Sequence, residues 1–270
     1  MSYPVDYQPT PKLLRDRVVL VTGAGDGIGH AVSLACATHG ATVVLAGKTV
    51  KKLEAVYDEI EQAGGPQPAI YPINLEGATP TDYDQLTQTI ESRLERLDGL
   101  VHCAALLPYL SRIKDHEAND WMKIMQVNLN APFLLTQALF RLLEASDNGR
   151  VIFTVDRVGT EGRAFWGAYG VSKTGLDSLA RIWAQELENN RLRVNRIDPG
   201  PTLTALRKRV FPGEDGSTLK RPEAIANAYL WLLDPANSIN GECLCLDQPA
   251  QSRHRPGSPM PCSPKDTSPT

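Results

Sequence analysis

The stretch VVLVTGAGDGIG, residues 18–29, decides how this 270-residue chain folds. Its apolar, β-branched start predicts a buried strand, and the pattern over Ile28–Thr38 predicts a helix directly after the turn. Glycines in such a turn permit positive φ and remove the Cβ atoms that would keep a phosphate away from the N–H groups of the helix N-terminus. We therefore expect a dinucleotide site whose contacts include Thr22, Gly23, Gly25, Asp26, Gly27, Ile28 and Gly29.

The alternation of strand and helix continues along the chain. Further strands are predicted at Ala41–Ala46, Ala69–Ile73, Leu100–Cys103, Arg150–Thr154, Leu192–Ile197 and Glu242–Leu246. Further helices are predicted at Val50–Gln62, Thr81–Leu97, Asn119–Ala145, Trp166–Glu188 and Pro222–Leu233. Right-handed crossovers place such helices on both faces of one parallel sheet. The predicted fold class is therefore α/β, a single doubly wound (Rossmann) domain over residues 13–250 with a seven-stranded parallel sheet.

Composition and the two ends of the chain narrow the class of protein. Residues 1–12 are predicted to form an N-terminal extension, and residues 251–270, rich in Pro and Ser, a disordered tail. The net charge of −3 is spread along the chain, which argues against a nucleic-acid partner. No secretory signal or apolar run of about eighteen residues points to a membrane. Five cysteines without metal-ligand spacing favour reduced thiols, a cytoplasmic location and no metal site.

The choice between NAD and NADP depends on the end of the second predicted strand. An acidic residue there would bond the ribose hydroxyls of NAD, but the chain reads Ala46-Gly47-Lys48. Lys48 offers a charge-assisted contact to a 2′-phosphate, although it fits equally well as a solvated lysine at a helix start. Asp26 in the glycine turn argues the other way. NADP is therefore the preferred cofactor and NAD the alternative.

Tyr169 and Lys173 lie four residues apart in the helix after the fifth predicted strand, which puts them on one helical face. A tyrosine that exchanges protons near neutral pH needs its pKa lowered from about 10, and a nearby lysine cation acts in that direction. The spacing alone occurs by chance in many chains, usually between surface neighbours. Its position in the fold gives it weight here.

Several motifs in order resemble the short-chain dehydrogenase/reductase family over residues 13–249, and within it the YciK-type bacterial oxidoreductases. They are DYQPTPKLLRDRVVLVTGAGDGIG, MQVNLNAPFLLTQAL, RAFWGAYGVSK and LRVNRIDPGPTLTALR. The resemblance implies hydride transfer between nicotinamide C4 and a small carbonyl or alcohol substrate, with Tyr169 as general acid/base. It implies that Lys173 lowers the Tyr169 pKa and holds the nicotinamide ribose, and that Asn128 positions a water beside it. It also implies a homodimer or homotetramer.

The same resemblance implies further cofactor contacts after three other strands. Asn74 stands where the family often has an Asp that bonds adenine, and an amide oxygen can still accept that bond. The fourth strand ends in HCAA, residues 102–105, where the family commonly has NNAG, and its predicted contact is Ala104. Contacts after the sixth strand are Pro199, Gly200, Thr202 and Thr204. The segment Ala205–Leu219 stands where the family has its substrate lid, and a solvated basic loop is the favoured interpretation.

Asp156 is the main departure from the family pattern, because it stands thirteen residues before Tyr169, where a substrate-polarising serine is expected. An ionised carboxylate can only accept hydrogen bonds, opposes negative charge on a substrate oxygen and raises the pKa of a neighbouring tyrosine. Protonation of Asp156, donation by Thr154, or neutralisation by Arg157 would each relieve the conflict. The alternative to an oxidoreductase is a catalytically degenerate dinucleotide-binding protein that senses or scaffolds.

Overall fold

The computed structural model describes residue 4 and residues 6–247, and these form a seven-stranded, all-parallel sheet. Its strand order is β3-β2-β1-β4-β5-β6-β7, which confirms the predicted doubly wound fold. The strands are β1 (Val18–Thr22), β2 (Thr42–Gly47), β3 (Ala69–Pro72), β4 (Gly99–His102), β5 (Arg150–Thr154), β6 (Arg193–Asp198) and β7 (Cys243–Cys245). The order reverses between β1 and β4, where open α/β sheets bind ligands at the carboxyl ends of their strands. The predicted tail at 251–270 lies outside the described residues.

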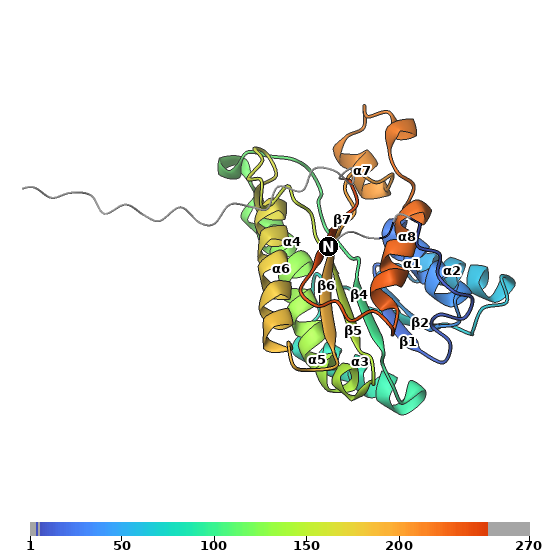
Figure 1. The fold of residues 1–270 in the computed structure, drawn as a ribbon. Coiled ribbons are helices and arrows are strands. Elements are labelled where there is room, and N and C mark those ends of the chain that lie inside the picture. The colour runs from blue at the N-terminus through green and yellow to red at the C-terminus, as the bar shows by residue number, and fades with distance from the viewer. Residues whose placement is uncertain (1–3, 5, 248–270) are drawn as a thin grey trace, which may run out of the picture.

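Helices cover both faces of the sheet (Figure 1). Those on one face are α1 (Gly27–Thr38), α2 (Val50–Gln62) and α8 (Pro222–Leu233), and those on the other are α3 (Pro80–Leu94), α4 (Ala118–Met125), α5 (Ala131–Ala145) and α6 (Gly167–Glu186). Three short elements are η1 (Ile113–Asp115), η3 (Gly216–Thr218) and α7 (Ala205–Val210), of which α7 lies beyond the carboxyl ends of the strands. Within the described residues, no helix has the length and hydropathy needed to cross a membrane.

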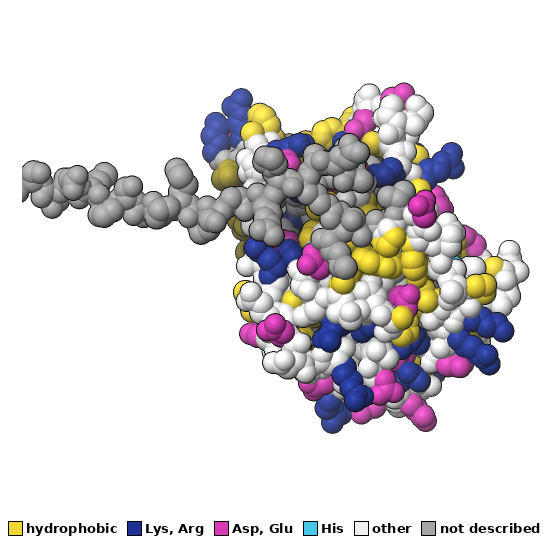
Figure 2. All heavy atoms as spheres, viewed as in Figure 1, with side chains coloured by type: hydrophobic (Ala, Val, Ile, Leu, Met, Phe, Trp, Pro, Cys, Tyr) yellow, Lys and Arg dark blue, Asp and Glu magenta, His cyan; other side chains and the backbone are white. Residues whose placement is uncertain are grey.

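Side chains that alternate along the strands supply both halves of the core. Val18 and Leu20 of β1 pack with α3, α5 and α6, whereas Val19 and Val21 pack with α1, α2 and α8. All five residues of β1 are buried, as expected for a central parallel strand covered on both sides. Charged side chains of both signs are interspersed over the face seen in Figure 2.

The helix predicted over Asn119–Ala145 is interrupted, because a π-helical turn, η2 (Gln126–Asn130), separates α4 from α5. Pro132 has no N–H to donate to the carbonyl of Asn128, four residues earlier, and its ring pushes that carbonyl away. One wider turn accommodates the proline and lets the helix continue. The turn also places the Asn128 side chain in the interior, where it is fully buried.

Candidate active site

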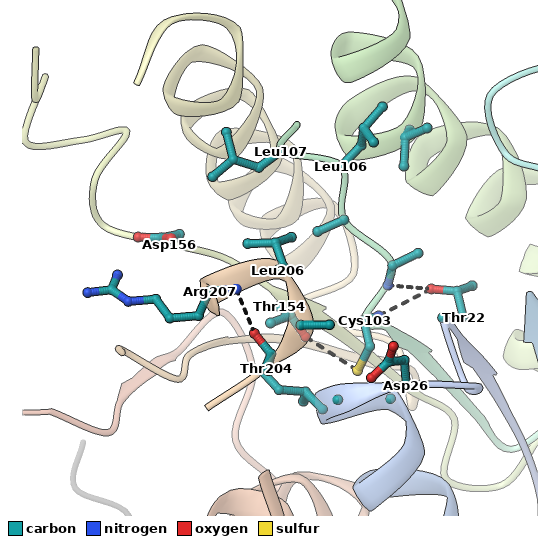
Figure 3. A pocket seen from close by; sticks show the side chains of 18 of the residues that line it. Thr22, Asp26, Cys103, Leu106, Leu107, Thr154, Asp156, Thr204, Leu206 and Arg207 are labelled. Carbon is teal, nitrogen blue, oxygen red and sulfur yellow. Dashed lines mark hydrogen bonds between the residues drawn. The ribbon is translucent and has the colours of Figure 1, made fainter. Parts of the chain in front are cut away.

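One pocket of about 490 Å³ at the carboxyl edge of the sheet joins the predicted cofactor site to the predicted catalytic site. Among the predicted residues, those that line it are Thr22, Gly23, Gly25, Asp26, Gly27, Ile28, Gly29, Lys48, Asn74, Ala104, Asp156, Tyr169, Lys173, Pro199, Gly200, Thr202 and Thr204. Asn128 does not line the pocket, but it is hydrogen-bonded to Leu106, which does. Figure 3 shows part of the pocket, with Asp156 and Thr204 projecting from separate segments.

The glycine turn is compact enough that two of its glycines leave no room for a side chain. A Cβ on Gly23, whose φ is +67°, would lie 3.0 Å from the backbone of Ala104, and one on Gly29 would lie 2.3 Å from the Gly23 carbonyl oxygen. Thr22 Oγ1 accepts N–H bonds from Cys103 and Ala104 at 3.1 and 3.2 Å, which ties the ends of β1 and β4 together. The turn thus holds the N-terminus of α1 against the pocket, and these residues fit a dinucleotide pyrophosphate.

Replacing Gly29 with alanine is expected to separate the turn from α1, because the new Cβ would meet the Gly23 carbonyl oxygen at 2.3 Å. We expect a loss of about 2 kcal/mol in the free energy of unfolding and at least a tenfold weaker affinity for NADPH. Urea denaturation and tryptophan-fluorescence titration measure the two effects. Gly77→Ala is the matched control, because no atom lies within 4 Å of its added Cβ. Unchanged NADPH affinity in Gly29→Ala would contradict this role of the turn.

The far end of the pocket carries two lysines, each held by an acidic partner. Lys48 Nζ lies 2.9 Å from Glu76 Oε1, and 61% of its side-chain surface is exposed. The contact to a 2′-phosphate and the solvated lysine therefore both stay predictions. Lys52, which the sequence analysis did not single out, forms an ion pair with Asp26 and lines the same pocket. Its position at the start of the helix after the second strand, close to Lys48, was the available signal. Both cations line the pocket after the carboxyl end of β2.

The Tyr169 hydroxyl donates a hydrogen bond to Asp156 Oδ2 at 3.1 Å. Asp156 Oδ1 accepts a bond from the Val158 N–H at 3.1 Å, which fixes the carboxylate in place. Burial, followed by the charge of Asp156 and this hydrogen bond, raises the pKa of Tyr169 well above 10. The net shift of the Tyr169 pKa is therefore upward, in the direction expected from Asp156, whereas the lowering expected from Lys173 stays a prediction.

Lys173 is a buried cation next to this pair, with only 2% of its surface exposed. Its Nζ donates to the Thr154 carbonyl oxygen at 2.8 Å and lies 5.8 Å from the centre of the Tyr169 ring. Burial lowers the pKa of Lys173 to about 8, against an opposing effect of Asp156. The lysine thus lies close to Tyr169 but is not hydrogen-bonded to the tyrosine hydroxyl.

Asn128 connects the pocket wall to the catalytic helix. Its Oδ1 accepts the Leu106 N–H at 2.7 Å, and its Nδ2 donates to the Leu106 carbonyl at 3.0 Å and to Ser172 Oγ at 3.1 Å. Leu106 lines the pocket, and Ser172 directly precedes Lys173. The side chain therefore holds the loop after β4 and the helix α6 at a fixed separation.

Thr154 and Arg157, the two neighbouring groups expected to relieve the conflict at Asp156, have other partners. Arg157 Nη2 lies 3.1 Å from Asp247 Oδ2, and its Nε also contacts Glu161. The Thr154 hydroxyl is bonded to the hydroxyl of Tyr229 at 3.0 Å. Arg157 forms no ion pair or hydrogen bond with Asp156 within the part of the chain that the structure describes, so it does not neutralise that carboxylate by direct pairing. Donation by Thr154 to a substrate stays a prediction.

The segment after β6 folds over the pocket rather than forming the solvated loop that was favoured. Thr204 Oγ1 caps α7 by accepting the Arg207 N–H at 3.1 Å, and Arg207 binds Glu214 through two contacts of 2.6 Å. Gly200 has a φ of +64°, and a Cβ there would lie 2.1 Å from the Asp247 carboxylate. That carboxylate also binds Lys220, which fixes the turn beneath α7. A six-residue helix has too short a pattern to be read from sequence.

At the end of β4, His102 belongs to the core, whereas Cys103, Ala104 and Ala105 line the pocket. His102 Nε2 lies 2.8 Å from Thr136 Oγ1, its ring stacks on Phe153 at 4.8 Å, and burial lowers its pKa to about 3. Burial raises the pKa of Cys103 to about 12, which disfavours the thiolate form. Among the residues described, no cluster of three or more His, Cys, Asp or Glu side chains could hold a metal ion.

The family model, the related sequences and the solved structures that match this chain agree with one another. A family model described as short chain dehydrogenase matches residues 17–215. The chain is 44% identical over 227 residues to the uncharacterized oxidoreductase YciK of Escherichia coli K12, over 84% of this chain and 90% of that protein. A short chain dehydrogenase structure from Shigella flexneri complexed with NADP matches with a TM-score of 0.86 and 41% identity, over 88% of this chain and 100% of that one. One from Escherichia coli CFT073 complexed with NADPH matches with a TM-score of 0.86 and 42% identity, over 89% and 100%.

The family model covers the glycine turn and the Tyr169–Lys173 helix together. The matches confirm the resemblance inferred from the motifs, including its YciK-type character. The chain belongs to the short chain dehydrogenase family, whose members are NAD(P)-binding oxidoreductases.

Proposed function

We propose that this protein is an NADP(H)-dependent oxidoreductase that moves a hydride between nicotinamide and a carbon of a small substrate. Carbonyl and alcohol groups are the first substrate class to test. The observation that carries the proposal is the single pocket in which the glycine turn and the Tyr169–Lys173 pair face the same space. A glycine turn alone would support binding only, and a Tyr–Lys pair alone would be a coincidence of spacing.

Each side chain has a separate task in this proposal. The turn and the N-terminus of α1 hold the pyrophosphate, while Lys48 and Lys52 offer positive charge for a 2′-phosphate. When bound, the nicotinamide supplies or accepts the hydride. Tyr169 exchanges the proton at the reacting atom, and Lys173 stabilises negative charge on the Tyr169 oxygen. Asn128 fixes the spacing between the pocket wall and α6.

The preference for NADP is tested by Lys48→Ala, which is expected to weaken NADPH binding about tenfold and leave NADH binding within about twofold. The physical reason is that only NADPH carries the 2′-phosphate that the ammonium group would contact. Tryptophan-fluorescence titrations with both cofactors provide the measurement. Lys51→Ala removes a neighbouring exposed charge outside the pocket and serves as the control. Equal losses for NADPH and NADH would show that Lys48 does not contact the 2′-phosphate.

A second candidate function, cofactor binding without turnover, is favoured by one observation. Asp156 accepts the only proton of Tyr169, and burial beside it keeps that proton on the tyrosine. An assay of NADPH oxidation with aldehydes and ketones separates the candidates. Turnover supports the oxidoreductase, and tight NADPH binding without turnover of any substrate class supports the sensor or scaffold.

Assembly as a homodimer or homotetramer is proposed through the outer face of α5 and α6. Phe133 on α5 and Val171 and Ile182 on α6 are large apolar side chains that are 37%, 45% and 51% exposed. Light scattering during gel filtration measures the assembled mass, and replacement of Ile182 by lysine is a direct test of this face.

A further inference from the structure

The Tyr169–Asp156 pair presents only hydrogen-bond acceptors to a substrate. The phenol has a single proton, and it is donated to Asp156 Oδ2 at 3.1 Å. The remaining groups at this point are lone pairs on the phenol oxygen and on the carboxylate. A carbonyl oxygen, itself an acceptor, finds no donor here. The substrate atom that binds this pair must therefore bring its own proton.

The charge near the pair is also negative. Asp198, 3% exposed, lines the same pocket, and its Oδ1 accepts the Gly200 N–H at 3.0 Å. Its Oδ2 is buried without a hydrogen-bond partner among the residues described. Neither Asp156 nor Asp198 forms an ion pair within that same part of the chain. Both carboxylates act electrostatically on Tyr169 and Lys173.

Three of the cations that line the pocket already have partners. Lys173 donates to a backbone carbonyl, and its buried ammonium lies beside the Tyr169 ring. Arg157 and Arg207 each pair with a different carboxylate, at 3.1 and 2.6 Å. Arg207 lies on the same side of the pocket as Asp156 in Figure 3. Its guanidinium already binds both carboxylate oxygens of Glu214.

The other walls of this end of the pocket are apolar. Leu106, Leu107 and Leu206 line it and are visible in Figure 3. Trp166 and Phe211 line it too, and their ring centres are 5.9 Å apart. The Phe211 face is already covered by the Arg207 guanidinium, whose carbon lies 4.0 Å from the ring centre. Apolar walls of this kind favour a substrate with a hydrocarbon body. Together with the acceptor pair, they describe a site for an apolar molecule with one positively charged N–H group.

We propose that the reacting group is a carbon–nitrogen group, a protonated imine in the reducing direction and the corresponding amine in the reverse. The inference rests on the proposed hydride transfer and names its substrate class. The iminium N–H donates to Asp156 during hydride transfer, and the Tyr169 phenol keeps its proton through that step. Tyr169 afterwards donates that proton to the nitrogen of the product amine and is reprotonated from solvent. The hydride from the reduced nicotinamide forms a new C–H bond, and the electron pair of the C=N π bond becomes the nitrogen lone pair. The products of the hydride transfer are a neutral amine and the oxidised cofactor, so charge and electrons balance.

The change in charge on the reacting atom explains why the Asp156 carboxylate favours reduction of a C=N group over reduction of a C=O group. Reduction of a ketone develops negative charge on oxygen beside Asp156, which the carboxylate opposes. A protonated imine is positive before reaction and neutral after it, so no negative charge develops beside the carboxylate. An alcohol also brings an O–H donor, but the alkoxide character that develops as it loses a hydride is disfavoured by the same carboxylate.

The test compares two probes of similar size, the cyclic imine 2-methyl-1-pyrroline and the ketone 2-methylcyclopentanone, by NADPH oxidation. We expect the wild-type kcat/KM to be at least about tenfold higher for the imine. Asp156→Asn, which keeps the shape and the bond to Val158, and Asp156→Ser are expected to lower the imine rate at least about tenfold and raise the ketone rate. Glu161→Gln removes an exposed charge from the same loop outside the pocket and is expected to change neither.

A binding measurement separates this inference from the proposed hydride transfer. Calorimetric titration of 2-methylpyrrolidine, as its ammonium ion, into the enzyme with NADP⁺ is expected to show binding that weakens about tenfold in Asp156→Asn. If NADPH binds but neither probe reacts, hydride transfer fails, and loss of amine binding in Asp156→Asn still supports the charge recognition. If the ketone reacts as fast as the imine, or if the amine binds wild type and Asp156→Asn equally, the carbon–nitrogen assignment is overturned.

Discussion

Replacing Tyr169 with phenylalanine is expected to lower kcat/KM for hydride transfer about a thousandfold. The change removes one oxygen from a side chain that is 6% exposed and keeps the ring that packs against Trp166. It deletes the hydroxyl that contacts Asp156 at 3.1 Å, which is the proposed proton-exchanging group at the reacting atom. NADPH affinity is expected to stay within about twofold, because the pyrophosphate contacts lie elsewhere in the pocket. Steady-state kinetics on the better of the two probe substrates and fluorescence titration measure the two quantities.

Tyr229→Phe is the matched control for this substitution. Tyr229 is also buried, and its hydroxyl bonds to Thr154 at 3.0 Å, but it is not among the residues that line the pocket. Both variants lose one buried hydroxyl and one hydrogen bond, so general destabilisation affects them alike. A rate for Tyr169→Phe within about threefold of the Tyr229→Phe rate would remove Tyr169 from the proton-exchange role.

The parts of this molecule that sequence could predict are those with a local cause. The glycine turn was readable because its spacing limits which backbone conformations are available, and the buried strands because their apolar runs are short and regular. Pro132 can be read from the sequence, but its effect on the helix cannot. The π-helical turn that buries Asn128 forms only because the helix continues beyond the proline as α5. The location of the pocket followed from the order of strands and helices.

Properties that depend on burial and on partners distant in sequence could not be predicted. The pKa of Tyr169 rises rather than falls because the side chain is buried against Asp156, and burial is a property of the packed chain. The sequence makes Arg157 a plausible ion-pair partner for Asp156, its neighbour in the chain. The fold instead places Asp247, which follows β7, 3.1 Å from Arg157 Nη2. The charged state of a site depends on which of several possible pairs the fold brings together.

Replacing Lys173 with methionine is expected to lower the rate of hydride transfer at least about a hundredfold while stabilising the fold at neutral pH. Lys173 is 2% exposed, and burial lowers its pKa from 10.5 to about 8. A shift of this size corresponds to roughly 3 kcal/mol of unfavourable free energy for holding the cation in the folded state. Methionine relieves that cost but loses the hydrogen bond to the Thr154 carbonyl, so we expect a net gain of about 1 to 2 kcal/mol at pH 7.

The sign of the pH dependence distinguishes this explanation from simple repacking. Below about pH 8, Lys173 is protonated in both folded and unfolded states, and the wild type bears the full cost of the buried charge. Between about pH 8 and 10.5, the unfolded chain binds the proton and the folded chain does not, so wild-type stability rises with pH relative to Lys173→Met. Urea denaturation of both proteins at pH 7, 9 and 10 should therefore show the advantage of methionine shrinking, with Lys51→Met as a surface control.

The activity of the wild type should change in the opposite direction to its stability. As pH rises through about 8, Lys173 loses the charge that stabilises a developing tyrosinate, and kcat is expected to fall with an apparent pKa near that value. A methionine advantage that does not vary with pH, together with a flat rate profile above pH 8, would mean that Lys173 stays protonated in the folded chain over this range and that burial does not lower its pKa. If instead both curves change in the same pH range, one buried proton on Lys173 reduces the stability of the fold and is required for the reaction.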